Sequence, residues 1–374
     1  MSKCHFPCKC KGSATSTCGS SGALGAMATL PRFDAAKNRI DNPHVVILGA
    51  GASIAACPNG DRNGRILPSL QNVQETVGLD DLIIEIEKQE GSLGDGFEAK
   101  YSKLVELGTY PNEVERIDQA VSDYFRSLRL PDAVSIYDLL ILGLREKDFI
   151  FTFNWDPFLL QAYRRCSAEF STPSLYFLHG CVDVAFCAEC KVTSNCGIPC
   201  PRCGNDMVPS QLLYPVTQKD YESDPVIKSA WDALRYALDD AYFVTIFGYS
   251  APVTDVAARQ VMIDTFSNNR FYEFAEVEII DIRSREDIES SWSDFFFSHH
   301  YGIFKEFRHS WIFRHFRRSC DAFAMATLMC HPVPENPPAG IVSIQELREF
   351  ARGLQHEENS GAKFWENEAN PFGA

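Results

Sequence analysis

Residues 44–53 read His-Val-Val-Ile-Leu-Gly-Ala-Gly-Ala-Ser. Four apolar residues lead directly into a turn that contains Gly49 and Gly51, and Ser53 follows, where it can cap a helix. A buried parallel strand ends in this way when a nucleotide binds at its carboxyl end. Glycine lets backbone N–H groups approach a pyrophosphate, and a helix N-terminus favours the negative charge. The same pattern also occurs in plain tight turns, and the motifs in the rest of the chain distinguish the two.

Length and composition limit the possible classes of protein. The chain has 374 residues, which is enough for one large α/β domain with an insertion or for two domains. Its formal charge of -15 disfavours direct binding along a nucleic-acid backbone. The sequence contains no run of 18 apolar residues and no signal-peptide pattern, so we expect a cytoplasmic protein without a membrane span. The 14 cysteines are clustered, which favours metal binding in a reducing compartment over disulfides.

Residues 1–28 have almost no apolar side chains. Four cysteines in this segment, Cys4, Cys8, Cys10 and Cys18, lie among serine, glycine, lysine and threonine. We expect a disordered leader or a tag, because such a composition cannot bury a core. A small metal knuckle that also uses His5 is the alternative.

The segment between the opening turn and residue 145 contains a loop and a helical region. Residues 58–64 form a loop by composition, and a helical pattern restarts near residues 67–70. This loop follows the candidate nucleotide turn, so it is either a lid over the site or a surface excursion. Residues 71–145 carry apolar side chains at helical spacing, and we expect a helical insertion packed beside the sheet.

Two further strands deliver polar side chains to their carboxyl ends. The strand at 149–153 leads into Asn154 and Asp156, and a strand starting at residue 176 ends on His179. An amide and a carboxylate at this edge can hold a ribose or a carboxamide and can orient a water molecule; an Asn-x-Asp helix cap is the alternative. A histidine can serve as a general base near neutral pH, although a single histidine is more often structural.

The later strands complete the pattern of a doubly wound sheet. A strand at 242–247 ends in Gly248-Tyr249-Ser250, and a helix follows whose start is marked by Asp255. The strand at 276–282 carries Asp281, a carboxylate that suits the hydroxyl groups of a ribose. At least five strands, each ending in polar or glycine residues, are separated by helices. This predicts an α/β fold, a Rossmann-like doubly wound parallel sheet with a zinc ribbon and a helical insertion.

Two C-x-x-C pairs are the strongest local signal in the chain. Cys187, Cys190, Cys200 and Cys203 supply four thiolates at the spacing of a zinc ribbon, which we place at residues 181–210. Four sulfur ligands leave no open coordination position, so the zinc is expected to be structural. Cys181 and Cys196 can each substitute for one of the four, and a redox role is the alternative.

Residues 284–374 are expected to form a C-terminal aromatic-rich helical region with a poorly ordered tail. Residues 292–316 combine many aromatic side chains with histidine and arginine. Nucleic-acid binding by stacking is one interpretation, and a core or oligomer-interface helix is the favoured one.

The order of these motifs resembles that of the sirtuin family. The shared sequence is Gly-Ala-Gly-Ala-Ser at 49–53, Thr-Phe-Asn-Trp-Asp at 152–156, His179-Gly180, the paired C-x-x-C motifs and Gly248-Tyr249-Ser250. The resemblance covers residues 44–283 and implies a sirtuin-like Rossmann domain at 29–283. It also implies that NAD⁺ is a substrate cleaved between nicotinamide and ribose, beside a small structural zinc domain.

Two departures separate this chain from protein-deacylating sirtuins. Those proteins have Gly-Ile-Pro-x-Phe-Arg soon after the glycine turn, where this chain has Cys-Pro-Asn-Gly at 57–60. They also have a Phe-Gly-Glu strand that pairs with the acyl-lysine peptide, where this chain has Leu-Leu-Tyr-Pro-Val at 212–216. Both departures resemble the divergent sirtuin-like NAD⁺ hydrolases of bacterial anti-phage (abortive infection) systems.

The resemblance therefore implies hydrolysis of NAD⁺ to nicotinamide and ADP-ribose. It places Asn154, Asp156 and His179 in catalysis. The residues expected to bind NAD⁺ are Gly49, Ala50, Gly51, Ser53, Thr152, Gly248, Ser250 and Asp281. An NAD⁺-dependent protein deacylase and a catalytically silent nucleotide-sensing subunit are the alternatives.

An NAD⁺ hydrolase that is always active would kill its host, so control is expected. We expect it to come from a homo-oligomer or from a separate partner chain, with residues 292–316 as the candidate interface. In the bacterial defence systems that this chain resembles, the partner is often a DNA-translocase-type ATPase.

Overall fold

The computed structural model describes residues 33–34, 39–69, 71–214, 221–251, 255–296 and 300–361. The leader or metal knuckle predicted for residues 1–28 lies outside these residues. The strands are β1 (Phe33–Asp34), β2 (Arg39–Ile40), β3 (His44–Leu48), β4 (Phe149–Thr152), β5 (Ser174–Phe177), β6 (Val184–Cys187), β7 (Val192–Asn195), β8 (Val208–Pro209), β9 (Phe243–Phe247), β10 (Glu276–Ile280) and β11 (Tyr301–Phe304). The helices are α1 (Ala50–Ala56), α2 (Val73–Val77), α3 (Asp80–Glu90), α4 (Gly96–Leu107), α5 (Pro111–Ser127), α6 (Ile136–Gly143), α7 (Phe158–Cys166), α8 (Pro225–Asp239), α9 (Val256–Ser267), α10 (Arg285–Trp292), α11 (Trp311–Arg314), α12 (Ser319–Thr327) and α13 (Ile344–Ser360).

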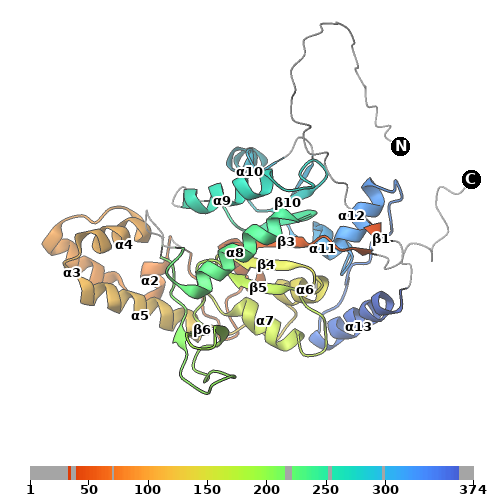
Figure 1. Ribbon diagram of the computed structural model, residues 1–374. Helices are drawn as coiled ribbons and strands as arrows, with labels where there is room; N and C mark the ends of the chain where they lie inside the picture. Colours follow the sequence, from red (N-terminus) through yellow and green to blue (C-terminus); the bar gives the residue numbers. More distant parts are fainter. Residues whose placement is uncertain are drawn as a thin grey trace, which may run out of the picture.

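The central sheet is parallel and has six strands in the order β11-β10-β9-β3-β4-β5 (Figure 1). The chain runs from β3 outward through β4 to β5, and then from β9 outward through β10 to β11. This reversal of direction puts the topological switch point between β3 and β9. Leu48 pairs with Thr152 on one side and with Phe247 on the other, so the three strands end level. The predicted Rossmann-like doubly wound fold is confirmed.

Helices cover both faces of the sheet, which explains why β3 is apolar along its whole length. All five residues of β3 are buried. Val45 and Ile47 pack with α8, α9 and α10 on one face, whereas Val46 and Leu48 pack with α1, α6 and α7 on the other. A strand with two buried faces reads as a continuous apolar run and not as an alternating one.

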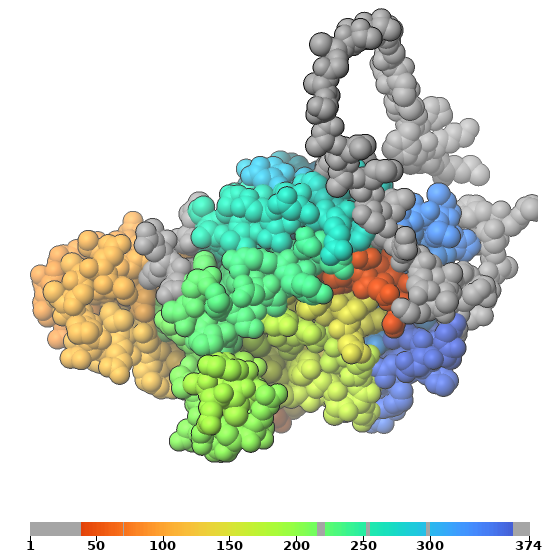
Figure 2. All heavy atoms as spheres, viewed as in Figure 1, coloured from red at the N-terminus to blue at the C-terminus, as the bar shows by residue number. Residues whose placement is uncertain are grey.

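Two smaller parts project from this body. Helices α2 to α5 form an arm beside the sheet, in the region predicted to be a helical insertion (Figure 1). The zinc-ribbon region contains a three-stranded antiparallel sheet in the order β7-β6-β8. It forms a separate protrusion on the molecular surface (Figure 2).

The described residues after 283 pack on the sheet and contain the expected helices, α10 to α13, together with a strand that was not expected. Strand β11 pairs with β10 in parallel and forms an edge of the sheet. Trp292, Phe295 and Phe316 are at most 1% exposed, so these rings fill the core and are not available as an interface. The sequence did not predict β11 because its four residues are only half-buried and lie among aromatic residues without strand alternation.

Buried polar contacts tie this C-terminal part to the amino ends of the central strands. Asp148 accepts hydrogen bonds from the backbone N–H of His44 at 2.9 Å and of Arg145 at 2.8 Å. Asp321 of α12 accepts from the backbone N–H of Ile40 at 2.6 Å and pairs with Arg145. Such pairs satisfy groups whose burial would otherwise be costly.

None of the helices in the described part of the chain is long and apolar enough to cross a membrane.

The turns after β3 and β9 pack against each other without any side chain between them. A Cβ atom on Gly49 would lie 2.5 Å from the Gly248 carbonyl oxygen, and one on Gly248 would lie 2.3 Å from the Ala52 nitrogen. The Gly51 N–H donates to the Gly248 carbonyl oxygen at 3.0 Å. These glycines therefore allow a close approach of two backbone turns.

Substitution of Gly248 tests this contact. Gly248 has φ +63°, and Gly108 at the end of α4 has φ +66° with open space where a Cβ atom would lie. Gly108→Ala should lower the free energy of unfolding by about 1 kcal/mol, the cost of the left-handed backbone. Gly248→Ala should lose about 1–3 kcal/mol more, because the methyl group overlaps Ala52. Urea denaturation measures both, and equal losses would contradict the close packing.

Candidate active site

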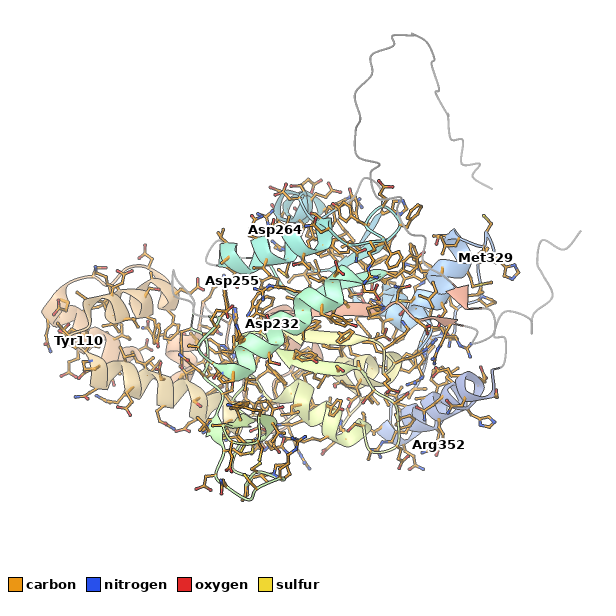
Figure 3. The ribbon with its side chains drawn as sticks, in the orientation of Figure 1. Tyr110, Asp232, Asp255, Asp264, Met329 and Arg352 are labelled. Atoms are coloured by element: carbon orange, nitrogen blue, oxygen red, sulfur yellow. The ribbon has the colours of Figure 1, made fainter. Side chains whose placement is uncertain are left out.

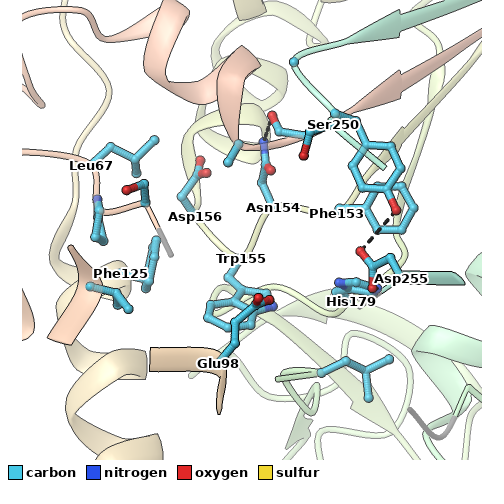
Figure 4. Close-up of a pocket in the computed structure, with 18 residues that line it drawn as sticks. Leu67, Glu98, Phe125, Phe153, Asn154, Trp155, Asp156, His179, Ser250 and Asp255 are labelled. Carbon is cyan, nitrogen blue, oxygen red and sulfur yellow. Dashed lines mark hydrogen bonds and ion pairs between the residues drawn. The ribbon is translucent and has the colours of Figure 1, made fainter. Parts of the chain in front are cut away.

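A cavity of about 170 Å³ opens at the switch point of the sheet, above the carboxyl ends of β3, β4 and β9. It is the place where ligands of doubly wound sheets bind. The described residues that line it are Gly49, Ala50, Leu67, Pro68, Ser69, Val73, Glu98, Phe125, Phe153, Asn154, Trp155, Asp156, His179, Leu213, Gly248, Tyr249, Ser250 and Asp255 (Figure 4). The structure thus brings Asn154, Asp156 and His179 together, as expected.

The amide of Asn154 is held in a fixed orientation. Its Nδ2 donates to the Gly49 carbonyl oxygen at 2.9 Å and to Ser53 Oγ at 2.8 Å. Its backbone N–H donates to Thr152 Oγ1 at 3.0 Å, which shapes the turn after β4. No described residue donates to Oδ1, so this oxygen remains as a hydrogen-bond acceptor in the cavity lining (Figure 4).

Ser53 is the centre of the hydrogen-bond network beneath the cavity. Its hydroxyl donates to Asp156 Oδ2 at 2.7 Å and accepts from Asn154 Nδ2. Tyr137 of α6 lies 2.5 Å away through its hydroxyl. A hydroxyl has one donor and two acceptor positions, so the Tyr137 O–H donates to Ser53 when Asp156 is ionised. Ser53 is fully buried inside α1 and does not cap the helix, contrary to expectation.

Asp156 is a buried carboxyl group. Only 4% of the residue is exposed, and this burial raises its pKa to about 6. The hydrogen bonds from Ser53 and from the backbone N–H of Phe158 act in the opposite direction, because they stabilise the carboxylate. Asp156 therefore changes its charge just below neutral pH.

The position of His179 is set by the strand before it and by the chain that leaves the zinc ribbon. His179 is two residues beyond the end of β5, and its carbonyl oxygen accepts the backbone N–H of Leu213 at 3.0 Å. The preceding carbonyl oxygen, of Leu178, accepts Trp231 Nε1–H at 3.1 Å. The His179 ring packs edge-on against Phe153, with centroids 4.8 Å apart.

The loop after α1 is anchored by the buried carboxylate of Asp61. Its oxygens accept the backbone N–H groups of Asn63 and Arg65, both at 2.8 Å, and of Arg129 at 3.0 Å. The end of this loop, residues 67–69, lines the cavity. Residues 58–64, the predicted loop, are not among the described residues that line the cavity, and the lid interpretation stays a prediction.

Four of the residues predicted to bind NAD⁺ are not among the described residues that line this cavity. Ser53 and Thr152 support the lining residues through hydrogen bonds, Ser53 to Asp156 and Thr152 to Asn154. Gly51 packs on Gly248. Asp281 is bonded to Arg283, with Arg283 Nε 2.9 Å from its Oδ2. The structure places Gly49, Ala50, Gly248 and Ser250 in the lining, as predicted.

Several lining or supporting residues had no signal in the sequence. Tyr137, Glu98 and Phe125 come from helices predicted only as packing elements. Asp255 was recognised as the start of a helix, but its side chain makes no cap bond and faces the cavity instead. Only the packing of the arm and of helices α6 and α9 against the sheet brings these residues to the site.

The four cysteines predicted to bind zinc form one cluster. The Sγ atoms of Cys187, Cys190, Cys200 and Cys203 all lie within 4.8 Å of one another. Cys187 Sγ and Cys203 Sγ are 3.7 Å apart, close to the ~3.8 Å edge of a tetrahedron with Zn–S bonds of about 2.3 Å. The cluster therefore suits a structural zinc ion. Cys181 and Cys196 are not part of it.

Neither a protein-family model nor a curated protein sequence matches the chain. Among solved structures, it is similar to Sir2 in complex with the inhibitor EX-527, 2′-O-acetyl-ADP-ribose and a deacetylated p53 peptide. That match has 14% identity and a TM-score of 0.38, and covers 85% of this chain and 94% of that chain. A Sir2 homologue in complex with NAD matches with 11% identity and a TM-score of 0.38, over 84% of this chain and 90% of that chain. Because these TM-scores are below 0.5, the proposals below rest on the residues of the site.

Replacement of single cysteines tests the metal cluster. Cys200→Ser should lower the bound zinc and the melting temperature, because one of four ligands is weakened. Cys196→Ser is the matched control, since it lies in the same ribbon but outside the cluster, and should keep about one zinc per chain. Elemental analysis and thermal unfolding measure both effects. Full zinc content in Cys200→Ser would refute the assignment.

The raised pKa of Asp156 predicts a pH-dependent stability. The folded-state pKa of about 6 lies above the unfolded value, so this group contributes stability at low pH and loses it as the pH rises from about 4 through about 6. Asp156→Asn should remove this dependence. Relative to the variant, the wild type should lose about 2–3 kcal/mol of unfolding free energy over this interval. Urea denaturation between about pH 4 and pH 6 measures both free energies of unfolding. A difference between wild type and Asp156→Asn that does not change with pH would show that the pKa of Asp156 is not raised.

Proposed function

We propose that this protein hydrolyses NAD⁺ at the bond between nicotinamide and ribose. The observation that carries the proposal is the meeting of Asn154, Asp156 and His179 in one cavity at the switch point. The reaction consumes NAD⁺ and water and yields nicotinamide, ADP-ribose and a proton. Its transition state resembles an oxocarbenium ion, so the site has to stabilise positive charge and place a water molecule.

Each of the three side chains fits one of these tasks. Hydrogen bonds from Asn154 Nδ2 to Gly49 and Ser53 fix the orientation of the amide. Its Oδ1 can therefore orient a ribose hydroxyl or the attacking water. Asp156 as a carboxylate stabilises the cationic ribose or binds the nicotinamide end. His179 accepts a proton from the water or from a ribose hydroxyl.

The first turn of α1 is the expected seat of the pyrophosphate. Gly49 and Ala50 stand in the cavity lining at the N-terminus of this helix, and Gly248 and Ser250 lie beside them. A helix N-terminus favours the negative charge of a phosphate.

The packing of Tyr214 supports hydrolysis over protein deacylation. The Tyr214 ring stacks on Tyr101 of α4, with centroids 4.4 Å apart and an interplanar angle of 19°. Its hydroxyl donates to the Asp118 carbonyl oxygen at 3.3 Å, and 7% of the residue is exposed. Tyr214, which by the sequence resemblance lies in the counterpart of the peptide-pairing strand of deacylases, is thus packed against the arm.

Control of such an activity is part of the proposal. The cell loses NAD⁺ whenever the enzyme is active, so a homo-oligomer or a separate partner chain is expected to switch it on. We place the protein in bacterial anti-phage defence, with a DNA-translocase-type ATPase as the candidate partner. Residues 292–316 remain the candidate contact surface, through exposed residues such as Arg308, because the rings of Trp292, Phe295 and Phe316 are buried.

An NAD⁺ turnover assay with product identification tests the proposed function. The protein, alone and with candidate partners, should release nicotinamide without an acylated peptide. Asn154→Ala and His179→Ala should each lower this release by about 10²-fold or more. His309→Ala, at an exposed histidine outside the cavity, should retain it. Consumption that requires an acetyl-lysine peptide and matches it one-for-one would instead indicate a deacylase.

A further inference from the structure

Asp255 is a buried carboxylate beside His179 that has no part in the reaction as proposed above. It is 5% exposed and occupies the N-cap position of α9 (Figure 3). Aspartate at this position usually accepts a backbone N–H of the first helical turn, a bond worth about 1 kcal/mol. Asp255 makes no such bond. Its Oδ2 accepts the Tyr249 hydroxyl at 3.1 Å, and its Oδ1 lies 4.0 Å from His179 Nε2 (Figure 4).

Two aromatic rings, those of Tyr249 and Phe153, connect the two members of this pair. Tyr249 stacks face to face on Phe153, with centroids 4.1 Å apart and an angle of 9°. Phe153 in turn packs against the His179 ring at 4.8 Å and 76°. The hydroxyl of the same Tyr249 holds the carboxylate. The ring and the carboxylate are therefore positioned by one frame built from the ends of β4 and β9.

The charged side chains that share the cavity with His179 are acidic. Tyr221, from the segment before α8, faces the ring at 6.3 Å. Glu98 and Asp156 line the same cavity, and neither lysine nor arginine is among its described lining residues. The carboxylate oxygen Oδ1 of Asp255 lies 4.0 Å from His179 Nε2. An opposite charge at this distance raises the pKa of a histidine.

We propose that Asp255 is a positioning residue for His179 in the NAD⁺ cleavage. At 4.0 Å from Nε2 the carboxylate is beyond hydrogen-bond distance, so it acts on the ring through its charge: it favours the tautomer with the proton on Nε2 and leaves Nδ1 to accept a proton. The water oxygen bonds to C1′ and its proton goes to His179. The electron pair of the broken C1′–N bond leaves with nicotinamide, and the imidazolium, stabilised by Asp255, returns the proton to solvent. Tyr249 holds Asp255 in place.

The role of Asp255 in the reaction rests on the proposed function, whereas its pairing with His179 does not. The experiment therefore has two readouts. The first is the pKa of His179 in the substrate-free protein, followed by NMR of labelled histidine and assigned with His179→Ala. In Asp255→Asn the pKa of His179 should fall by about one unit, because the charge is lost while the shape stays. The second is turnover, where kcat should fall by about 10²-fold with KM little changed.

Asp255→Ser is the second variant, because serine is also a favourable N-cap residue and keeps the start of α9. Both variants should retain the zinc content and melting temperature of the wild type, and exposed His309 should titrate as before. An unchanged pKa of His179 in a folded variant would overturn the proposal. If the wild type releases no nicotinamide, the proposed function fails while the titration still decides the pairing. Tyr249→Phe keeps the ring stack, and an unchanged kcat in this variant would remove Tyr249 from the assignment.

Discussion

The backbone contact between the turn after β3 and the turn after β9 is the constraint on which the site depends. Gly51 donates its N–H to the Gly248 carbonyl oxygen at 3.0 Å, and a Cβ atom on Gly49 or Gly248 would overlap the other turn. This contact fixes the N-terminus of α1 at the switch point of the sheet. The Gly49 carbonyl oxygen can then accept the Asn154 amide, and Ser53 can reach Asp156. The polar network of the site is therefore built on a glycine contact in which no side chain takes part.

That network holds its members before any ligand binds. Asn154 is fixed through its nitrogen, Asp156 through Ser53 and the N–H of Phe158, and His179 through its own backbone and the ring of Phe153. Preorganised donors and acceptors need little rearrangement during a reaction, which is why they stabilise developing charge effectively. The arm adds Glu98 and Phe125 to one wall, so anything that moves the arm changes the shape of the cavity. This gives the helical insertion a direct connection to the chemistry.

Prediction from the sequence succeeded where a local pattern has one physical cause. Apolar runs ending in glycine or polar residues gave the parallel strands, and the cysteine spacing gave the cluster at Cys187 and Cys203. It failed where a residue acts through a distant partner. Ser53 was expected to cap a helix and bind phosphate, but it lies inside α1, where only the approach of Tyr137 and Asp156 defines its role. Strand β11 was missed because an edge strand of four half-buried residues has no alternation to detect.

The sequence by itself determined the Rossmann-like fold class and the cysteine cluster, and it selected Asn154, Asp156 and His179 as candidates, which line one cavity. Each of these follows from residues that are adjacent or regularly spaced along the chain. Only the tertiary structure decided that Tyr137 and Ser53 support the site, that the rings of Trp292, Phe295 and Phe316 are buried beside the edge strand β11, and that Asp255 lies close to His179. The physical reason is that these contacts join residues of separate elements. Burial and distance between such residues exist only after the helices have packed on the sheet.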